Sequence, residues 1–138
     1  MIKAKDIMQK EAVSLQANST ISEMIALLVK HKITGIPIVD PKNILIGIIS
    51  EKDLLGCIFA PNLGNKAVKD LMATKVVSMD EDASIIEVCL LLSEKNFRRV
   101  PIVNKNQELV GIVSRSDLIA YVYEQFKKGT PIKIPLHC

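Results

Sequence analysis

Two copies of the motif Ser-x-x-Asp are the residues best suited to chemistry in this sequence. They lie at Ser50 to Asp53 and at Ser114 to Asp117. A carboxylate can accept two hydrogen bonds from the neighbouring hydroxyls of a ribose, and a hydroxyl beside free helix N–H groups suits a phosphate. The same spacing also describes a helix cap, in which Ser and Asp satisfy the first N–H groups of the helix. Both interpretations remain open from the residues alone.

The other reactive side chains form no catalytic or metal-binding pattern in the sequence. His31 and His137 stand alone, and Cys57, Cys89 and Cys138 are widely spaced, without a Cys-x-x-Cys pair. The sequence also has no Gly-rich phosphate loop and no Gly-x-Ser-x-Gly motif. We therefore expect no enzymatic activity, no required cofactor and no metal site.

The two motifs belong to an internal repeat. Residues 33–54 align with residues 97–118 without a gap at an offset of 64, since 97 minus 33 is 64. Pro37 then falls on Pro101, and Gly47 falls on Gly111. A fixed period of this length is typical of a duplicated structural unit. The sequence therefore predicts two similar halves that position the two motifs in the same way.

Each half is predicted to fold as strand, helix, strand, strand and helix, preceded by a short turn of helix. The first helices begin at Thr20 and Ser84, because each of these is followed three residues later by Glu in a capping box and then by an apolar stripe. The last helices begin at the two Ser-x-x-Asp motifs, and the second is expected to run to about residue 128, before Gly129. The predicted helical turns are residues 5–8 and 69–72, and the predicted first strands are residues 13–15 and 77–79. The predicted hairpins pair residues 36–39 with 45–49 in the first half and residues 100–103 with 109–113 in the second.

Composition limits the size and type of the protein. The chain has 138 residues, of which 49% are apolar and only 4% aromatic, so the core is expected to be aliphatic and to fit one domain or two small halves. The net charge of +3 is mild and favours anionic ligands only weakly. No apolar stretch reaches the length of a signal peptide or a membrane span, so we expect a soluble cytoplasmic protein that does not contact a membrane.

Taken together, these features resemble a tandem pair of CBS domains, also called a Bateman module. The resemblance rests on Asp-Ile/Leu-Met at the start of each half, on the Ile/Val-Pro-Ile-Val strand, and on Gly-Ile-Ile/Val-Ser-x-x-Asp-Leu before the last helix. It implies an α/β (α+β) fold of two β-α-β-β-α repeats packed around a pseudo-two-fold axis. We expect repeat 1 at residues 1–60, a linker at 61–68, repeat 2 at 69–128 and a C-terminal tail at 129–138.

The resemblance also implies where an adenine nucleotide binds. Each cleft takes the Ser-x-x-Asp motif of one repeat and the first strands of the other. The base and ribose are expected beside Ser114 and Asp117, with the phosphate held by Arg98 or Arg99 and assisted by Arg115. A solvated strand start is the alternative for the two strand arginines. The implied set places Val13, Ile33, Thr34, Gly35, Ile36 and Pro37 opposite Ser114, Arg115 and Asp117, and it places Val77, Arg98, Arg99 and Pro101 opposite Ser50 and Asp53.

Two functional hypotheses follow from the resemblance. In the first, the chain is a regulatory module that forms a homodimer, binds AMP, ADP, ATP or S-adenosylmethionine, and signals to a regulated protein that the sequence does not identify. In the alternative, it is a protein-interaction or assembly module whose clefts bind no physiological nucleotide. Nucleic-acid binding is disfavoured, because no aromatic stacking platform accompanies the basic residues Lys95, Arg98, Arg99, Lys127 and Lys128.

Overall fold

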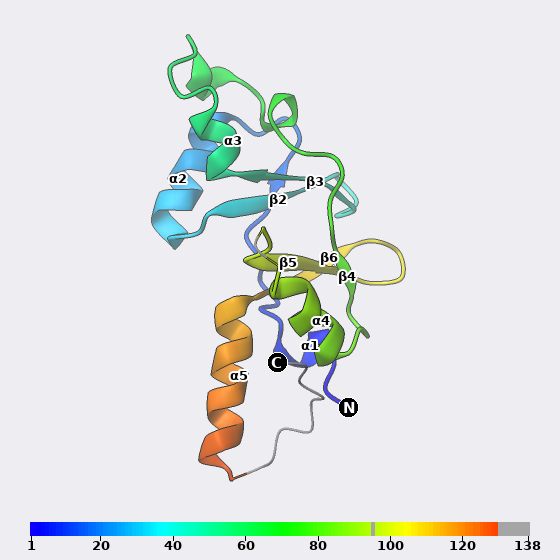
Figure 1. Ribbon diagram of the computed structural model, residues 1–138. Helices are drawn as coiled ribbons and strands as arrows, with labels where there is room; N and C mark the ends of the chain where they lie inside the picture. The colour runs from blue at the N-terminus through cyan, green and yellow to red at the C-terminus, as the bar shows by residue number, and fades with distance from the viewer. Residues whose placement is uncertain (95, 130–138) are drawn as a thin grey trace. The chain divides into compact units, whose positions relative to one another are not determined.

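The computed structural model describes residues 1–94 and 96–129, and the chain divides into two compact units. One unit contains Val13–Val76 and Asn106–Leu109, and we call it the Asp53 unit. The other contains Met1–Ala12, Val77–Lys105 and the chain from Val110 onward, and we call it the Asp117 unit. Each unit holds one three-stranded sheet with its own helices (Figure 1). This mixed architecture of strands and helices confirms the predicted fold class.

The Asp53 unit is built on the strands β1 (Leu15–Gln16), β2 (Gly35–Val39) and β3 (Leu45–Ser50), in that order. β1 is parallel to β2, whereas β2 and β3 form the predicted antiparallel hairpin, in which Gly35 lies opposite Ser50. The helix α2 (Ile21–His31) connects β1 to β2, because a parallel pair needs a crossover connection. The helix α3 (Glu51–Leu55) follows β3 directly, so the end of this hairpin becomes the start of a helix.

Helix α2 begins and ends where the sequence indicated. Oγ1 of Thr20 accepts a hydrogen bond from the N–H of Glu23 at 3.2 Å, which is the predicted cap. At the other end, Lys32 adopts a left-handed conformation, with φ of 53°, and its N–H donates to the carbonyl of Leu28. This geometry is a common way to terminate a helix, and it leaves His31 as the last helical residue.

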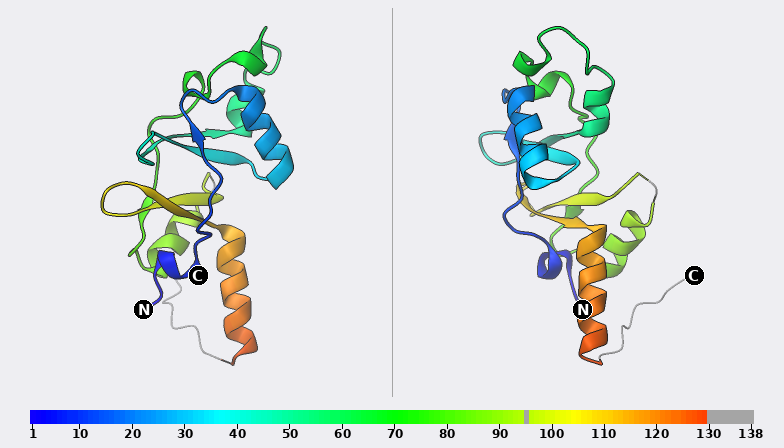
Figure 2. Two further views of the ribbon diagram at one scale, coloured as in Figure 1. Left: turned by 180° about the vertical axis from the view of Figure 1, so that it is seen from behind. Right: turned by 90° about the vertical axis from the view of Figure 1, so that its left-hand side faces the viewer.

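The Asp117 unit repeats this arrangement. Its strands β4 (Met79–Asp80), β5 (Arg99–Val103) and β6 (Leu109–Ser114) are ordered β4-β5-β6, and β4 is parallel to β5. The helix α4 (Ile85–Leu92) is capped by Oγ of Ser84, which accepts from the N–H of Glu87 at 3.3 Å. The helix α5 (Arg115–Lys127) follows β6, and α4 and α5 lie on the same side of their sheet (Figure 2).

Each unit has an aliphatic core built from equivalent positions of the two repeats. Seven buried positions of one core lie 64 residues from seven of the other, so both copies of the repeat use the same packing faces of their strands and helices. The Asp53 core contains Leu15, Ile21, Met24, Ile36, Ile38, Ile49, Leu54 and Val68. The Asp117 core contains Ala4, Ile85, Val88, Leu92, Val100, Ile102, Val113 and Leu118.

The segments at the start of the two repeats are exchanged between the units. The helix α1 (Ala4–Ile7) opens repeat 1 but lies in the Asp117 unit, where it contacts α5. The short 3₁₀ helix η2 (Val68–Asp70) opens repeat 2 but lies in the Asp53 unit. Beyond these turns, Gln9 forms an antiparallel bridge with Ile112, and Ala73 forms the equivalent bridge with Ile48. The sequence predicted both helical turns but not the unit that each one joins.

One detail differs from the sequence expectations: β1 and β4 begin at Leu15 and Met79, two residues later than predicted. Helix α3 has five residues. The region of the expected linker, residues 61–68, includes the 3₁₀ helix η1 (Leu63–Asn65), which contacts α2. Helix α5 ends as predicted, with Gly129 at φ of 68° beyond it. Of the expected C-terminal tail, residues 130–138 lie outside the described residues.

Candidate functional site

Ser114 and Asp117 form a complete reciprocal cap at the start of α5. The N–H of Ser114 donates to Oδ2 of Asp117 at 2.8 Å, and Oγ of Ser114 accepts from the N–H of Asp117 at 3.2 Å. These bonds fix the carboxylate at the positive end of a 13-residue helix. Oδ2 therefore has a structural role, whereas Oδ1 takes no part in this cap and accepts a hydrogen bond from another side chain.

Ser50 and Asp53 form the equivalent contact at the start of α3. The N–H and the hydroxyl of Ser50 both donate to Oδ2 of Asp53, at 2.8 and 3.1 Å. The N–H of Glu51 donates to the carbonyl of Thr34 at 2.9 Å, and Gly35 lies opposite Ser50 across the hairpin. The structure therefore brings Ser50 and Asp53 together with Thr34 and Gly35 of the same repeat.

Arg99 is a half-buried cation close to the Asp117 carboxylate. Among the residues that the structure describes, Nε of Arg99 is buried without a hydrogen-bond partner. Burial lowers the pKa of the Arg99 guanidinium, and the charge of Asp117 acts in the opposite direction. A buried donor without a partner is unfavourable, so an anion bound at this position would relieve a cost that the free protein carries.

Arg98 and Arg115 contribute differently from Arg99. The side chain of Arg98 is exposed, and its carbonyl accepts from the N–H of Arg115 at 3.0 Å. The guanidinium of Arg115 donates to the carbonyl of Leu92, the last residue of α4, at 2.8 Å, and to those of Phe97, at 2.9 Å, and Glu94 in the segment that follows. Arg115 thus holds the connection between α4 and β5.

Gln9 is a residue near this site that the sequence analysis did not select. Its Nε2 donates to Oδ1 of Asp117 at 3.0 Å, although the two residues are 108 positions apart in the chain. The residue at the equivalent position of the repeat is Ala73. The only signal in the sequence is that Gln9 follows the first Asp-Ile/Leu-Met motif whereas Ala73 follows the second. This signal points to Asp117 only when α1 is known to lie in the Asp117 unit.

The remaining predicted site residues are distributed between the two units. Those of the Asp53 unit are Val13, Ile33 and Thr34, which are half-buried, and Gly35, Ile36 and Pro37, which are buried. Those of the Asp117 unit are Pro101, which is buried, and Val77, which is exposed. The pairing of each Ser-x-x-Asp motif with the first strands of the other repeat stays a prediction.

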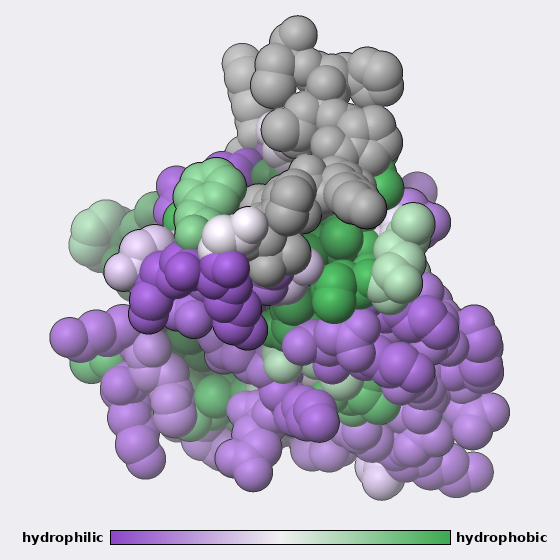
Figure 3. Space-filling model, turned by 90° about the horizontal axis from the view of Figure 1, so that it is seen from below, coloured by the Kyte–Doolittle hydropathy of each residue, from purple (hydrophilic) through white to green (hydrophobic). Residues whose placement is uncertain are grey.

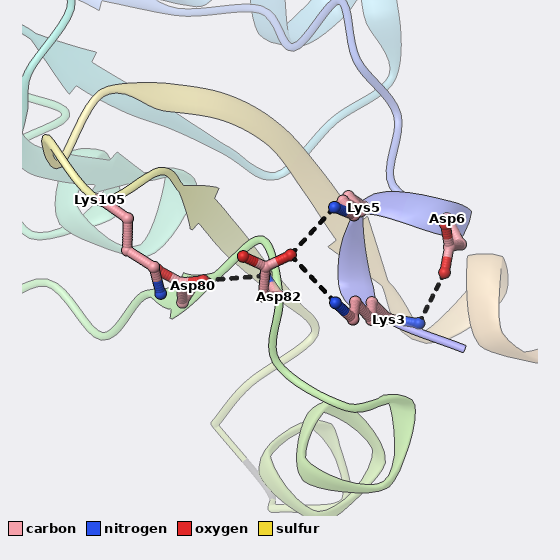
Figure 4. Close-up of polar contacts among 6 residues, drawn as sticks. All are labelled: Lys3, Lys5, Asp6, Asp80, Asp82 and Lys105. Atoms are coloured by element: carbon pink, nitrogen blue, oxygen red, sulfur yellow. Dashed lines mark hydrogen bonds and ion pairs between the residues drawn. The ribbon is translucent and has the colours of Figure 1, made fainter. Parts of the chain in front are cut away.

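An ion-pair cluster attaches the segment that carries Gln9 (Figure 4). Oδ1 of Asp82 lies 3.0 Å from Nζ of Lys5 and 3.5 Å from Nζ of Lys3. The hydrogen bond from Lys5 lowers the pKa of Asp82, and the same bond raises the pKa of Lys5. Beside them, Asp80 accepts from the N–H of Asp82 at 2.8 Å and pairs with Lys105 at 3.0 Å, which together lower the pKa of Asp80.

Residues 1–94 and 96–129 contain neither a candidate metal site nor a candidate membrane span. No group of three or more His, Cys, Asp or Glu side chains among those residues could hold a metal ion. Within the same residues, no helix combines the length and apolar character needed to cross a membrane.

Comparison with known proteins identifies the repeat. The family model for the CBS domain matches residues 4–60 and 68–124. L-aspartate semialdehyde sulfurtransferase of Methanocaldococcus jannaschii is 33% identical over 114 residues, which is 83% of this chain and 22% of that protein. Two further proteins of the same organism are matched over 35% and 42% of their length. The chain thus spans less than half of these relatives.

Two solved structures are similar along most of the chain. The CBS domain pair of protein MJ0100, in complex with 5′-methylthioadenosine and S-adenosyl-L-methionine, has a TM-score of 0.76 and 30% identity, covering 91% of this chain and 98% of that one. CBSX2 of Arabidopsis thaliana, in complex with AMP, has a TM-score of 0.81 and 25% identity, covering 90% and 98%. With two matches of the family model in one chain, these findings show that this protein belongs to the CBS domain family as a tandem pair.

Proposed function

We propose that this protein is a regulatory module that binds an adenosine-containing ligand and passes the signal to a partner protein. The observation that carries the proposal is the fixed carboxylate of Asp117, with Oδ2 held by the helix cap and Oδ1 left out of it. The AMP, S-adenosylmethionine and 5′-methylthioadenosine bound by the similar domain pairs support this choice of ligand class.

The proposed contacts follow from the chemistry of the ligand. Oδ1 of Asp117 accepts from the ribose hydroxyls, because an ionised carboxylate binds two neighbouring hydroxyls well. The phosphate of a nucleotide lies beside Arg99, where it gives the buried Nε a partner, and exposed Arg98 adds its charge. Ser50 and Asp53 form a second site of the same kind.

The proposal also keeps the cross-repeat arrangement as a prediction. In it, Val13 and residues 33–37 line the Ser114 and Asp117 site, while Val77 and Pro101 line the Ser50 and Asp53 site. A ligand that contacts both repeats can regulate only by favouring one arrangement of the repeats over another. Signalling in this form needs no catalytic step by the chain itself.

Calorimetric titration with AMP, ADP, ATP and S-adenosylmethionine tests the function. At least one compound is expected to bind, and Asp117→Ala should weaken that binding by about 10- to 100-fold, because hydrogen bonds to a charged group contribute about 1.5–3 kcal/mol. Arg99→Ala should weaken the binding of a phosphate-bearing ligand more than the binding of S-adenosylmethionine. Each variant is first compared with the wild type by thermal unfolding, since Asp117 also caps α5. No binding of any compound, or unchanged affinity in both variants, would reject the assignment.

Exposed apolar side chains on the helices favour self-association. They are also consistent with the alternative function, a protein-interaction or assembly module. Ile119, Tyr123 and Phe126 of α5 are 69%, 60% and 69% exposed, and their spacing of four and three residues places them on one face. Leu90 of α4 is also exposed. Figure 3 shows apolar side chains reaching the surface among polar ones. We propose a homodimer that uses this stripe.

Sedimentation measurements test the dimer. The wild type should sediment as a dimer, and Ile119→Lys with Tyr123→Lys should shift it towards the monomer, whereas the control Ala120→Lys beside the stripe should not. A monomeric wild type would reject the dimer. A dimer that binds no adenine compound would instead favour the interaction module.

A further inference from the structure

We propose that Gln9 controls the affinity of the Asp117 site by competing with the ligand for Oδ1 of Asp117. The inference rests on the proposed function, because it concerns the carboxylate to which that function assigns the ribose. In the free protein, Nε2 of Gln9 donates to Oδ1 at 3.0 Å, and the N–H of Ser114 occupies Oδ2 at 2.8 Å. Both carboxylate oxygens therefore have hydrogen-bond partners within the protein.

The backbone of Gln9 is fixed, so only its side chain can leave. The N–H of Gln9 donates to the carbonyl of Ile112 at 2.8 Å, and the N–H of Ile112 donates back to the carbonyl of Gln9 at 3.0 Å. The N–H of Ala4 donates to the carbonyl of Ala83 at 2.8 Å, and Lys5 pairs with Asp82. In contrast, Gln9 itself is an exposed residue, so its side chain can turn into solvent without a change of fold.

The other repeat contains the same site without the competing side chain. Ala73 occupies the position equivalent to Gln9, and it makes the same pair of backbone hydrogen bonds, with Ile48, at 3.0 and 2.9 Å. A methyl group cannot donate to Asp53, and the bonds from Ser50 both end on Oδ2 of Asp53. The two carboxylates therefore differ in the hydrogen bond from Gln9, which only Asp117 accepts. The backbone hydrogen bonds of residues 9 and 73 are the same.

This difference makes the two sites unequal in a predictable direction. A ligand at Asp53 gains its ribose contacts in full, whereas a ligand at Asp117 must first displace the amide of Gln9. Displacing one exposed hydrogen bond to a carboxylate should reduce affinity by about three- to tenfold. Gln9 is thus a specificity-determining residue that sets the ligand concentration at which the Asp117 site fills.

The exchange variants Gln9→Ala and Ala73→Gln test the inference, with AMP as the probe. In an Asp53→Asn background, which reports on the Asp117 site, Gln9→Ala should raise the affinity for AMP about three- to tenfold. In an Asp117→Asn background, Ala73→Gln should lower the affinity of the Asp53 site by a similar factor. Unchanged or weaker binding in the Gln9→Ala protein would overturn the inference, because it would mean that Gln9 is neutral or contacts the ligand favourably.

A measurement without ligand separates this inference from the proposed function. In ¹H–¹⁵N spectra of the free protein, the side-chain amide signals of Gln9 should move on Asp117→Asn and stay in place on the matched Asp53→Asn. Signals that move in neither variant would overturn the contact. If the wild type binds no adenine compound, the proposed function fails, and the spectra alone then decide whether Gln9 occupies the carboxylate.

Discussion

Gly111 lies directly beneath Met8, a residue from the opposite end of the chain. A Cβ atom at Gly111 would lie 2.5 Å from Sδ of Met8 and 2.9 Å from the carbonyl oxygen of Gln9. The equivalent pair in the other unit is Gly47 and Met72, for which the distance to Sδ would also be 2.5 Å. A Cβ is excluded at both positions, because the segment with Met8 lies against β6 and the segment with Met72 lies against β3.

Gly111→Ala should therefore destabilise the protein by about 1–3 kcal/mol, the usual cost of forcing an extra methyl group into a closely packed position. Met8 alone can move aside, but the carbonyl of Gln9 is backbone and is held by Ile112. Urea denaturation measures the effect, and Gly56→Ala is the control, since a Cβ there meets only an atom at 3.7 Å. A change below about 0.5 kcal/mol would contradict the contact.

The ion pair between Lys5 and Asp82 should stabilise the protein between about pH 4 and pH 10. The pKa of Asp82 is lowered from 3.8 by its hydrogen bond with Lys5, so its contribution is present above 3.8 and is lost as the pH falls through the lower folded value. The pKa of Lys5 is raised from 10.5 by the same bond. Its contribution is therefore present below 10.5 and is lost above the higher folded value.

A double-mutant cycle of Lys5→Gln and Asp82→Asn measures this coupling by urea denaturation. The coupling should be found at pH 7, weaken progressively as the pH falls below 3.8, and shrink in 1 M salt because both side chains are exposed. A coupling that changes with neither pH nor salt would show that the two side chains interact through something other than their charges.

Arg115→Lys should destabilise the Asp117 unit by about 1–2 kcal/mol. A lysine cannot reproduce the fork of N–H donors that reaches the carbonyls of Leu92, Glu94 and Phe97. If Arg115 holds this connection, AMP affinity should change less than the free energy of unfolding does. A large loss of AMP affinity with unchanged stability would instead return Arg115 to the phosphate contacts.

Removing the helix cap at Thr20 should cost about 1 kcal/mol. Thr20→Ala eliminates the acceptor for the N–H of Glu23, and the matched Ser84→Ala does the same for Glu87 in the other unit. Thermal unfolding reports both losses, with Thr74→Ala as an exposed control. Equal melting temperatures for all three variants would show that these caps contribute little.

The features predicted correctly from the sequence depend on neighbours within one repeat. Hairpin strands, helix caps at Thr20 and Ser84, and the end of α5 follow from apolar periodicity and from residue types a few positions apart. The offset of 64 residues strengthened each assignment, because every signal was found twice. The capping role of Asp53 and Asp117 was one of the two interpretations offered by the sequence, because a cap needs only the three-residue spacing from Ser to Asp.

The features that were not predicted depend on contacts distant in the chain. Nothing near Gln9 in the sequence indicates that it lies beside Asp117, because that contact requires α1 to pack in the Asp117 unit. No local pattern indicated that the guanidinium of Arg115 donates to the carbonyl of Leu92 at the end of α4, and its contact with a phosphate stays a prediction. Side-chain direction of this kind is fixed by tertiary packing, which local patterns do not encode.

The membership of Met1–Ala12 in the Asp117 unit has a practical consequence for dissecting this protein. Cutting the chain after Ala12 would release a dodecapeptide that belongs to the Asp117 unit. The next residues, from Val13, belong to the Asp53 unit. Such a peptide, added in trans to the remaining polypeptide, should reassemble along β6 by split-protein complementation. Reassembly would restore the neighbour of Asp117 without any covalent link between them.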